Sequence, residues 1–405
     1  MSDEKFVPAR STVTLGVVNG DLTVGAHATV KGAGSPPAIR VNGTIYCEGH
    51  NTFEGNVTVE GFEAEERAIV RGDLDVNGNV EVEDGSLEVY GKMNARQIDV
   101  DDKLYVSMSL SAEDVDVGGS ICVDGSVKAG DIDVGGTFET KGTLTARSID
   151  VGGTVVAGAR VDVGTLEVGG EARVAGGRIS EIDVGGSFES DGPLEFETIE
   201  VGGTVNIKGN SKGGEIEVGG SFRAEGDLEF KEIDVGGRVE LTGAATGREF
   251  EVGGRADVSS LKLSGALEVG GRFYSKDEVT ARSIEVGGSF EAKKATAEEH
   301  AEVGGSATTV EGLTAHSIEV GRRAEVRGDL KAEEIVIERD ARVENVYGKK
   351  VMLESGAEAN DISGEEITVE RHCRVNGHIR YTRELRVAEG ASLVNAPQKV
   401  DEKQL

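Results

Sequence analysis

The chain has 405 residues, of which 60 are Gly, 11 are Phe and none is Trp. Glycine is about twice as frequent as its usual share of 7%, and so much glycine weakens helices. The few aromatic residues leave little bulk for a thick globular core. Collagen is excluded because the glycines have no three-residue period. Disorder is disfavoured because 37% of the residues are hydrophobic and Val and Ile recur at fixed places.

The charge balance is strongly acidic. Asp and Glu number 74 against 43 Lys and Arg, a net charge of −31, which disfavours binding to nucleic acid and favours solubility. The opening residues MSDEKFVPAR have no apolar signal-peptide core, and no apolar run long enough to span a membrane follows. We therefore expect a soluble, cytoplasmic protein. Cys47, Cys122 and Cys373 are expected as reduced, partly buried thiols.

A short repeat dominates the sequence. The tripeptide Val-Gly-Gly recurs from Val117 to Val303, and Val320 follows before Gly-Arg. Eleven of the twelve intervals between these valines are 17 residues, and one is 16. Helical repeats are much longer, at about 33 to 47 residues. The repeat therefore indicates a solenoid that is not built from helices.

The spacing of apolar residues within one repeat predicts its geometry. Around Val134 they form three pairs, Ile132/Val134, Phe138/Thr140 and Leu144/Ala146. Each pair is two residues apart, the period of a strand with one face inward. Three such strands per turn predict an all-β fold, a single three-sided parallel β-helix. A left-handed β-helix needs three equal hexads, so the 17-residue turn favours the right-handed form.

The corners and the extent of the solenoid also follow from the repeat. Gly-Gly marks one corner, and a further Gly, as in Gly125 and Gly142, marks a second. Val24, Val41, Val59 and Val82 extend the Val series upstream, which predicts a bulged loop between Val59 and Val82 and another irregular corner at Pro36-Pro37.

We expect about 22 turns, roughly 105 Å at about 4.8 Å per turn. The predicted solenoid spans residues 13–395, less regular over 13–99, highly regular over 100–320 and less regular over 321–395. Polar tails are predicted at 1–12 and 396–405.

A column of carboxylates stands at the position before each repeat valine, pointing outward. Neighbours about 4.8 Å apart repel by roughly 0.9 kcal/mol even in water. One interpretation is a linear site for divalent cations or a track for a basic partner. The other, which we favour, is a solvated face that resists sideways aggregation, partly compensated by Arg238, Arg255 and Arg272. The column comprises Asp99, Asp116, Asp133, Asp150, Glu167, Asp183, Glu200, Glu217, Asp234, Glu251, Glu268, Glu285, Glu302 and Glu319.

Motifs for catalysis or cofactor binding are absent from the sequence. Cys47 with His50 and His372 with Cys373 could each begin a zinc site, but four converging ligands are needed and the two pairs are far apart. No G-x-S-x-G, Walker A or H-E-x-x-H pattern occurs. Almost every turn is minimal, which leaves little room for an active site. We predict no enzymatic activity, no cofactor and no resident metal.

The ends of a β-helix expose unpaired backbone and an open apolar core unless something caps them. Neither end shows an amphipathic helical cap. Two apolar ends favour end-to-end stacking into a filament, whereas tails folded over the ends would prevent it. The candidate contact residues are Val13, Leu15 and Val17 at the start and Leu385, Val387, Leu393 and Val394 at the finish.

The turn Ile-Glu-Val-Gly-Gly-Ser-Phe over residues 284–290, repeated over roughly residues 20 to 395, resembles the bactofilin family of polymer-forming cytoskeletal proteins. The resemblance implies a right-handed three-sided β-helix, nonpolar end-to-end assembly without nucleotide and a scaffolding role. It also implies self-association, association with another bactofilin-like protein, and a place in the cytoplasm or at the inner face of the membrane.

The chain departs from the family pattern in three respects. Its core is several-fold longer than usual, Leu385, Leu393 and Val394 lie where many members place a Phe, and MSDEKF matches a membrane-targeting tail only weakly. One alternative is a non-polymerising rod that spaces, anchors or regulates a shorter filament-forming partner. Another is a surface adhesin-type β-solenoid, for which a signal peptide would be expected. A carbohydrate-active β-helical enzyme would need an aromatic-lined groove, which the composition disfavours.

Overall fold

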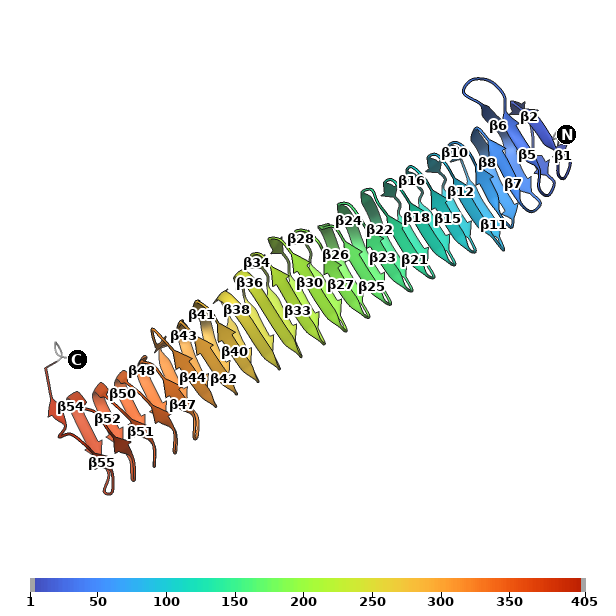
Figure 1. Cartoon of the computed structure of the whole chain (residues 1–405). Helices are drawn as coiled ribbons and strands as arrows, with labels where there is room; N and C mark the ends of the chain where they lie inside the picture. Colours follow the sequence, from blue (N-terminus) through green and yellow to red (C-terminus); the bar gives the residue numbers. More distant parts are fainter. Residues whose placement is uncertain (1–3, 402–405) are drawn as a thin grey trace. The chain divides into compact units, whose positions relative to one another are not determined.

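The computed structural model describes residues 4–401, and the regular elements among them are β-strands. The strands pair in parallel with partners about 17 residues away and form a β-solenoid of about 23 turns (Figure 1). The predicted all-β solenoid is confirmed, with about one turn more than the 22 expected. The chain divides into two compact units, Met1–Gly203 and Thr204–Leu405.

One turn of the first unit illustrates the three sides. It consists of β20 (Asp131–Val134), β21 (Thr137–Thr140) and the start of β22 (Leu144–Val151). Alternate residues face inward as predicted, and Val134, Phe138 and Leu144 are at most 1% exposed. Thr140, the one polar inward residue here, donates its hydroxyl hydrogen to the Gly125 carbonyl at 2.9 Å. The strand period of two therefore separates core from surface on every side.

The core consists of ladders of equivalent side chains. In the second unit, Phe273 of β40 (Arg272–Ser275) pairs in register with Phe290 of β42 (Ser289–Ala292). Their rings stack with centroids 5.3 Å apart, and both side chains are at most 2% exposed. Burying one such side chain stabilises the fold by about 1.5–3 kcal/mol. A core of limited width is thus stabilised by contacts between successive turns.

The Gly-Gly corners are fixed by close approach of the backbone. A Cβ on Gly288 would lie only 2.0 Å from the Gly271 carbonyl oxygen, and one on Gly287 would lie 3.3 Å from that of Gly270. Neither Gly287 nor Gly288 has a positive φ. Close packing between turns, and not a positive φ, is therefore the reason for glycine at this corner.

In the less regular turns, a different backbone conformation forms the same corner. Two to three residues after the inward residue that ends the strand, one residue adopts a left-handed conformation. Among these residues are His27 (φ 61°) in the first unit and Arg323 (φ 60°), Asp340 (φ 62°) and His372 (φ 61°) in the second. A single left-handed residue can thus replace the Gly-Gly pair, which explains why the repeat fades in sequence although the solenoid continues.

The register of the first turns corrects the prediction for residues 13–99. Val24 aligns with Cys47, and Cys47 aligns with Ala64, whereas Val41 and Val59 align with each other on a different side. The extra residues therefore lie between Val24 and Cys47. They form the loop between β5 (Thr29–Gly32) and β6 (Ala38–Cys47). The loop predicted between Val59 and Val82 was wrong because valines line all three sides, whereas the irregular corner at Pro36-Pro37 is confirmed.

The solenoid also extends into both predicted tails. β1 (Lys5–Val7) pairs with β4 (Leu22–Val24), so pairing begins inside the segment expected to be a polar tail over 1–12. At the other end, β56 (Gln398–Lys399) pairs with β54 (Ile379–Val387), inside the tail expected over 396–405. Polar residues are compatible with these strands because the last turns have solvent on one side. Residues 1–3 and 402–405 of the two predicted tails lie outside the described residues.

The two glycines of one corner allow a direct test of close packing. Gly288→Ala is expected to destabilise the protein by about 1–3 kcal/mol, the usual cost of forcing extra atoms into a packed site. Gly287→Ala is the matched control, since its added methyl group requires a shift of only a few tenths of an ångström in the neighbouring turn. Urea unfolding of both variants measures the difference. Equal destabilisation by the two substitutions would contradict the assignment.

Candidate functional site

The carboxylates predicted to form a column lie at equivalent positions on one side of the solenoid in each unit. Asp116 in β17 (Asp114–Val117) aligns with Asp99 and Asp133, and Glu268 in β39 (Ala266–Val269) aligns with Glu251 and Glu285. The register continues through Glu200 in the first unit and from Glu217 to Glu319 in the second. We call these residues, with the two added next, the acidic column.

Two members of the acidic column were missed from the sequence. Glu81 aligns with Asp99, and Glu63 aligns with Glu81. Upstream of them the same position holds Tyr46, Thr23 and Phe6, and downstream of Glu319 it holds Val336 and Met352. The sequence did indicate Glu81, because this residue directly precedes Val82, one of the valines of the repeat series. Glu63 was harder to predict because Ala64 occupies the position at which the repeat series has valine.

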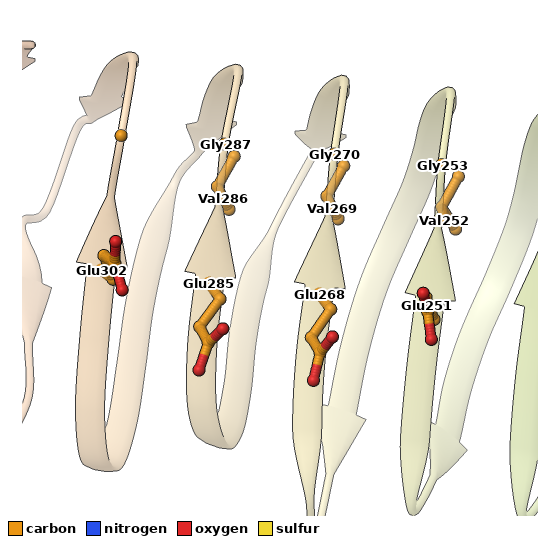
Figure 2. Close-up of a pocket in the computed structure, with 11 residues that line it drawn as sticks. Glu251, Val252, Gly253, Glu268, Val269, Gly270, Glu285, Val286, Gly287 and Glu302 are labelled. Carbon is orange, nitrogen blue, oxygen red and sulfur yellow. The ribbon is translucent and has the colours of Figure 1, made fainter. Parts of the chain in front are cut away.

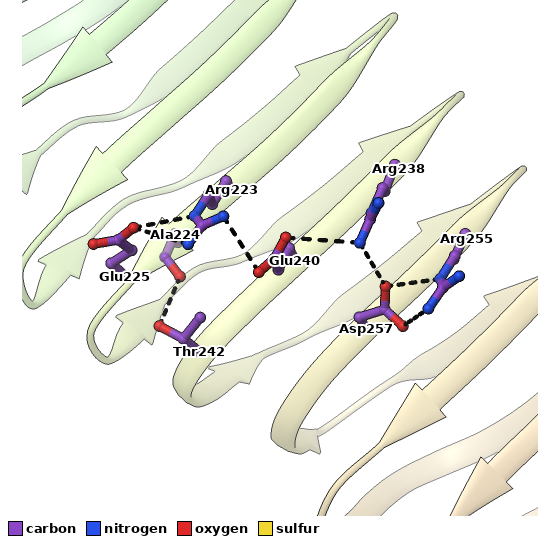
Figure 3. Close-up of polar contacts among 8 residues, drawn as sticks. All are labelled: Arg223, Ala224, Glu225, Arg238, Glu240, Thr242, Arg255 and Asp257. Atoms are coloured by element: carbon purple, nitrogen blue, oxygen red, sulfur yellow. Dashed lines mark hydrogen bonds and ion pairs between the residues drawn. The ribbon is translucent and has the colours of Figure 1, made fainter.

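No carboxylate of the acidic column forms an ion pair with any residue that the structure describes. On the adjacent side, by contrast, Arg223 lies 3.4 Å from Glu240 and Arg238 lies 3.1 Å from Asp257 (Figure 3). Arg255 also binds Asp257, at 2.7 Å. The predicted compensation of the column by Arg238 and Arg255 is therefore wrong: both neutralise the neighbouring side.

Burial and neighbouring charges raise the pKa of Asp116 and Glu268, two members of the acidic column. Partial burial, followed by the charges of Asp133 and Asp99, raises the pKa of Asp116. Partial burial, followed by the charges of Glu285 and Glu251, raises the pKa of Glu268. Ionisation of these two carboxylates therefore opposes folding at neutral pH, and that cost is offset by the stacked core behind them.

The acidic column borders shallow grooves. In the second unit, a groove of about 350 Å³ runs along Glu251, Glu268, Glu285 and Glu302 and is completed by the Val-Gly corners beside them. Figure 2 shows these glutamates on successive strands, with the corner residues beyond the strand ends. In the first unit, a groove of about 280 Å³ includes Tyr46 and the carboxylates around Glu63 and Glu81. Both linings offer negative charge, and that of the second unit also offers glycine backbone.

Among residues 4–401, no group of three or more His, Cys, Asp and Glu side chains is arranged to hold a metal ion. Cys47 and Cys373 are buried free thiols, and burial raises the pKa of both. His50 lies beside Glu66, with 3.3 Å between Nδ1 and Oε2. The interpretation of the column as a cation site has no further support from its geometry.

The predicted contact residues at the N-terminal end are not an open apolar surface. Leu15 is 4% exposed and Val13 is half-buried, whereas Val17 is 64% exposed because it points sideways, aligned with Arg40. The first inward position of β1 is occupied by Lys5, which is exposed and aligned with Leu22. The expectation of an apolar first turn is therefore only partly met, because a charged residue occupies one of its inward positions.

The C-terminal end is more open. Leu385 and Val387 of β54 continue the inward ladders of Ile367 and Val369, yet Leu385 is only half-buried and Val387 is 41% exposed. Leu393 also faces inward, aligned with Val375, and is half-buried. Val394, at 64% exposure, is next along the strand and lies on the opposite face. Three of the four predicted residues thus form an uncovered end of the core.

The backbone at this end is also available. Glu384 to Val387 pair with β52 (Ile362–Val369) on one edge. On the other edge, β56 pairs only with Arg380 and Tyr381, so no described strand covers the edge from Glu384 to Val387. Unpaired strand edges of this kind are sites where a further strand can add.

Comparisons with protein-family models, with curated proteins and with solved structures found no match to this chain. The described residues contain no helix of the length and apolarity needed to span a membrane.

The like-charge cost of the column can be measured with Glu268→Gln. Removing this charge is expected to raise the free energy of unfolding at pH 7 by a few tenths of a kcal/mol, about the size of a screened cross-strand pair. The folded-state pKa is raised, so the ionised group destabilises the protein above that pKa. This penalty disappears below the ordinary value of 4.5. Thermal unfolding from pH 7 to pH 4 should show the advantage of the variant shrinking as the pH falls.

Glu299→Gln is the matched control. Arg282 donates a hydrogen bond to Glu299 at 2.8 Å and lowers the pKa of that carboxyl. Its ionised form therefore stabilises the fold above the ordinary pKa, and its removal should lower the unfolding temperature at pH 7. If both variants changed stability in the same direction, the acidic column would not be a source of repulsion.

Proposed function

We propose that this protein is a structural scaffold that assembles end to end into filaments without nucleotide, through its terminal turns. The observation that carries the proposal is the open C-terminal turn, where the inward residues Leu385, Val387 and Leu393 are partly exposed beside a strand edge that no described strand covers. Another solenoid end placed there would continue the core and pair the backbone at once. Cytoskeletal function of the bactofilin type, in the cytoplasm or at the inner face of the membrane, is part of this proposal.

The distribution of charge supports contact at the ends and separation at the sides. Although the whole chain has a net charge of −31, residues 4–47 contain four Lys and Arg against two Asp and Glu. Residues 371–401 contain six Lys and Arg against three Asp and Glu. The negative charge is therefore concentrated between the ends, where the acidic column repels other copies. Self-association at the ends is opposed much less, and nucleic acid is disfavoured as a partner.

A second function is favoured by Lys5. A charged residue at an inward position of the first turn makes that end a poorer surface for stacking. A chain with one adhesive end could terminate, anchor or space a filament made by a shorter bactofilin-like partner, and would not polymerise by itself. Assembly of the purified protein alone distinguishes this function from the first.

Electron microscopy of the purified protein without nucleotide tests the proposal. We expect filaments, and we expect Leu385→Glu combined with Val387→Glu to abolish them, because two carboxylates would then lie on the apolar surface through which this end makes contact. Circular dichroism should show that this variant keeps its β-structure, since both substituted side chains lie in the last turns.

The control is Met352→Glu, which adds an acidic group to an outward position that is 36% exposed in the same unit. It should leave filaments intact. Particles that remain single chains at all protein concentrations would contradict self-assembly and favour the second function. Filaments unchanged by the two C-terminal substitutions would exclude this end as the contact.

A further inference from the structure

We infer that one turn of the second unit is a built-in opening point, at which the turns on its C-terminal side detach as a block while the turns before it stay folded. This turn is formed by β43 (Lys294–Val303) and β44 (Ser306–Thr309), which are labelled in Figure 1. We call residues 295–309 the alanine turn, because four of its six inward residues are alanine. The six are Ala295, Ala297, Ala301, Val303, Ala307 and Thr309, and each is at most 4% exposed.

The alanines of this turn lie between larger side chains of the flanking turns. Ala301 aligns with Ile284 in the turn before it and with Ile318 in the turn after it. An alanine has fewer apolar atoms than an isoleucine, so it buries less apolar surface against both neighbours. The same arrangement occurs in two more columns, with Ala295 between Val279 and Leu313 and Ala307 between Phe290 and Val326.

Thr309 adds an unsatisfied polar group to the alanine turn. Its side chain is 4% exposed, and its Oγ1 has no hydrogen-bond partner among residues 4–401. Ser275, at the equivalent position two turns earlier, donates its hydroxyl hydrogen to the Ser259 carbonyl at 3.3 Å. In the following turn Gly328 lies beside Thr309 and has no side chain to pack against it. A buried polar group without a partner opposes folding, so the alanine turn combines few apolar contacts with a polar cost.

The position of the alanine turn makes its weak contacts decisive for the turns that follow. In a solenoid each turn contacts only its neighbours, and the stability is approximately a sum over the interfaces between them. The strands within residues 313–327 pair with β43 and β44, so the later turns are joined to the earlier ones through this turn. When this connection breaks, the later turns separate together, whereas breaking a better packed interface costs more.

The interface directly before the alanine turn limits how far the opening extends. Phe273 and Phe290 stack there with ring centroids 5.3 Å apart, and both are at most 2% exposed. Two buried aromatic rings in contact resist separation more strongly than alanine against a larger side chain. Opening from the C-terminal side should therefore stop at this pair. A rod under tension would yield first at the alanine turn, and the turns before it would stay folded.

Hydrogen exchange of the full-length protein at low urea concentrations tests the inference. The amides of residues 313–369 should exchange through one common opening, at least about tenfold faster than those of residues 239–286. The boundary between the two groups should lie at the alanine turn. Protection that changes gradually along the second unit, or a boundary at another turn, would overturn the inference.

Two substitutions within the alanine turn should move the exchange of the block in opposite directions. Ala301→Val adds apolar atoms between the two flanking isoleucines and should slow exchange of residues 313–369 at least about fivefold. Val303→Ala removes apolar atoms from the same turn and should accelerate exchange by a similar factor. Faster exchange in Ala301→Val would show that this turn has no space to fill, and would contradict the inference.

Ala256→Val is the matched control. Ala256 is also fully buried between larger residues, Val239 and Phe273, but other inward residues of its turn include Leu261 and Leu263. This variant should leave the exchange of residues 313–369 unchanged. If it slowed their exchange as much as Ala301→Val does, the opening point would not be at the alanine turn.

The opening point goes beyond the proposed function and does not depend on association between chains. The exchange measurements use protein concentrations at which the chains are single. Block opening in a protein that never forms filaments would leave the opening point in place and refute the proposed function. Filaments formed by a protein without such a block would have the reverse meaning.

Discussion

Parallel stacking of equivalent positions about every 17 residues is the constraint on which the other features depend. It places each inward side chain on a similar one, so that a narrow core is buried although the chain has few aromatic residues. The same register places each outward side chain on a similar one. The acidic column is thus a direct consequence of the stacking that stabilises the core, and the arginines that could neutralise it pair with carboxylates on the adjacent side.

Most of the fold could be predicted because the repeat reports the register directly. Apolar residues two apart and Gly-Gly every 17 residues specify strands and corners from Val117 to Val320. The prediction failed where residues other than Gly-Gly form the corner. Left-handed residues such as His27 and Asp340 turn the chain without glycine, and the valines of different sides cannot be distinguished by type. The assignment of Val41 and Val59 to the wrong side follows from this ambiguity.

The candidate site could be predicted in part. The column required only the register, so most of its members were found from the sequence. Prediction of the contact residues at the two ends depended on their exposure, which a sequence does not specify. Leu15 and Val387 are both apolar residues near an end of the chain, yet Leu15 is 4% exposed and Val387 is 41% exposed. The inward position of Lys5, and the edge from Glu384 to Val387 that no described strand covers, became visible only when the pairing of the first and last strands was known.

The central claim is that the open C-terminal turn is a contact between chains. Hydrogen exchange of the backbone amides from Glu384 to Val387, measured over a series of protein concentrations, tests it most directly, since pairing would protect amides on this edge. The account predicts slower exchange in this segment as the concentration rises, while Thr137–Thr140 in an inner turn stays protected throughout. Exchange in this segment that remains fast at every concentration would contradict it.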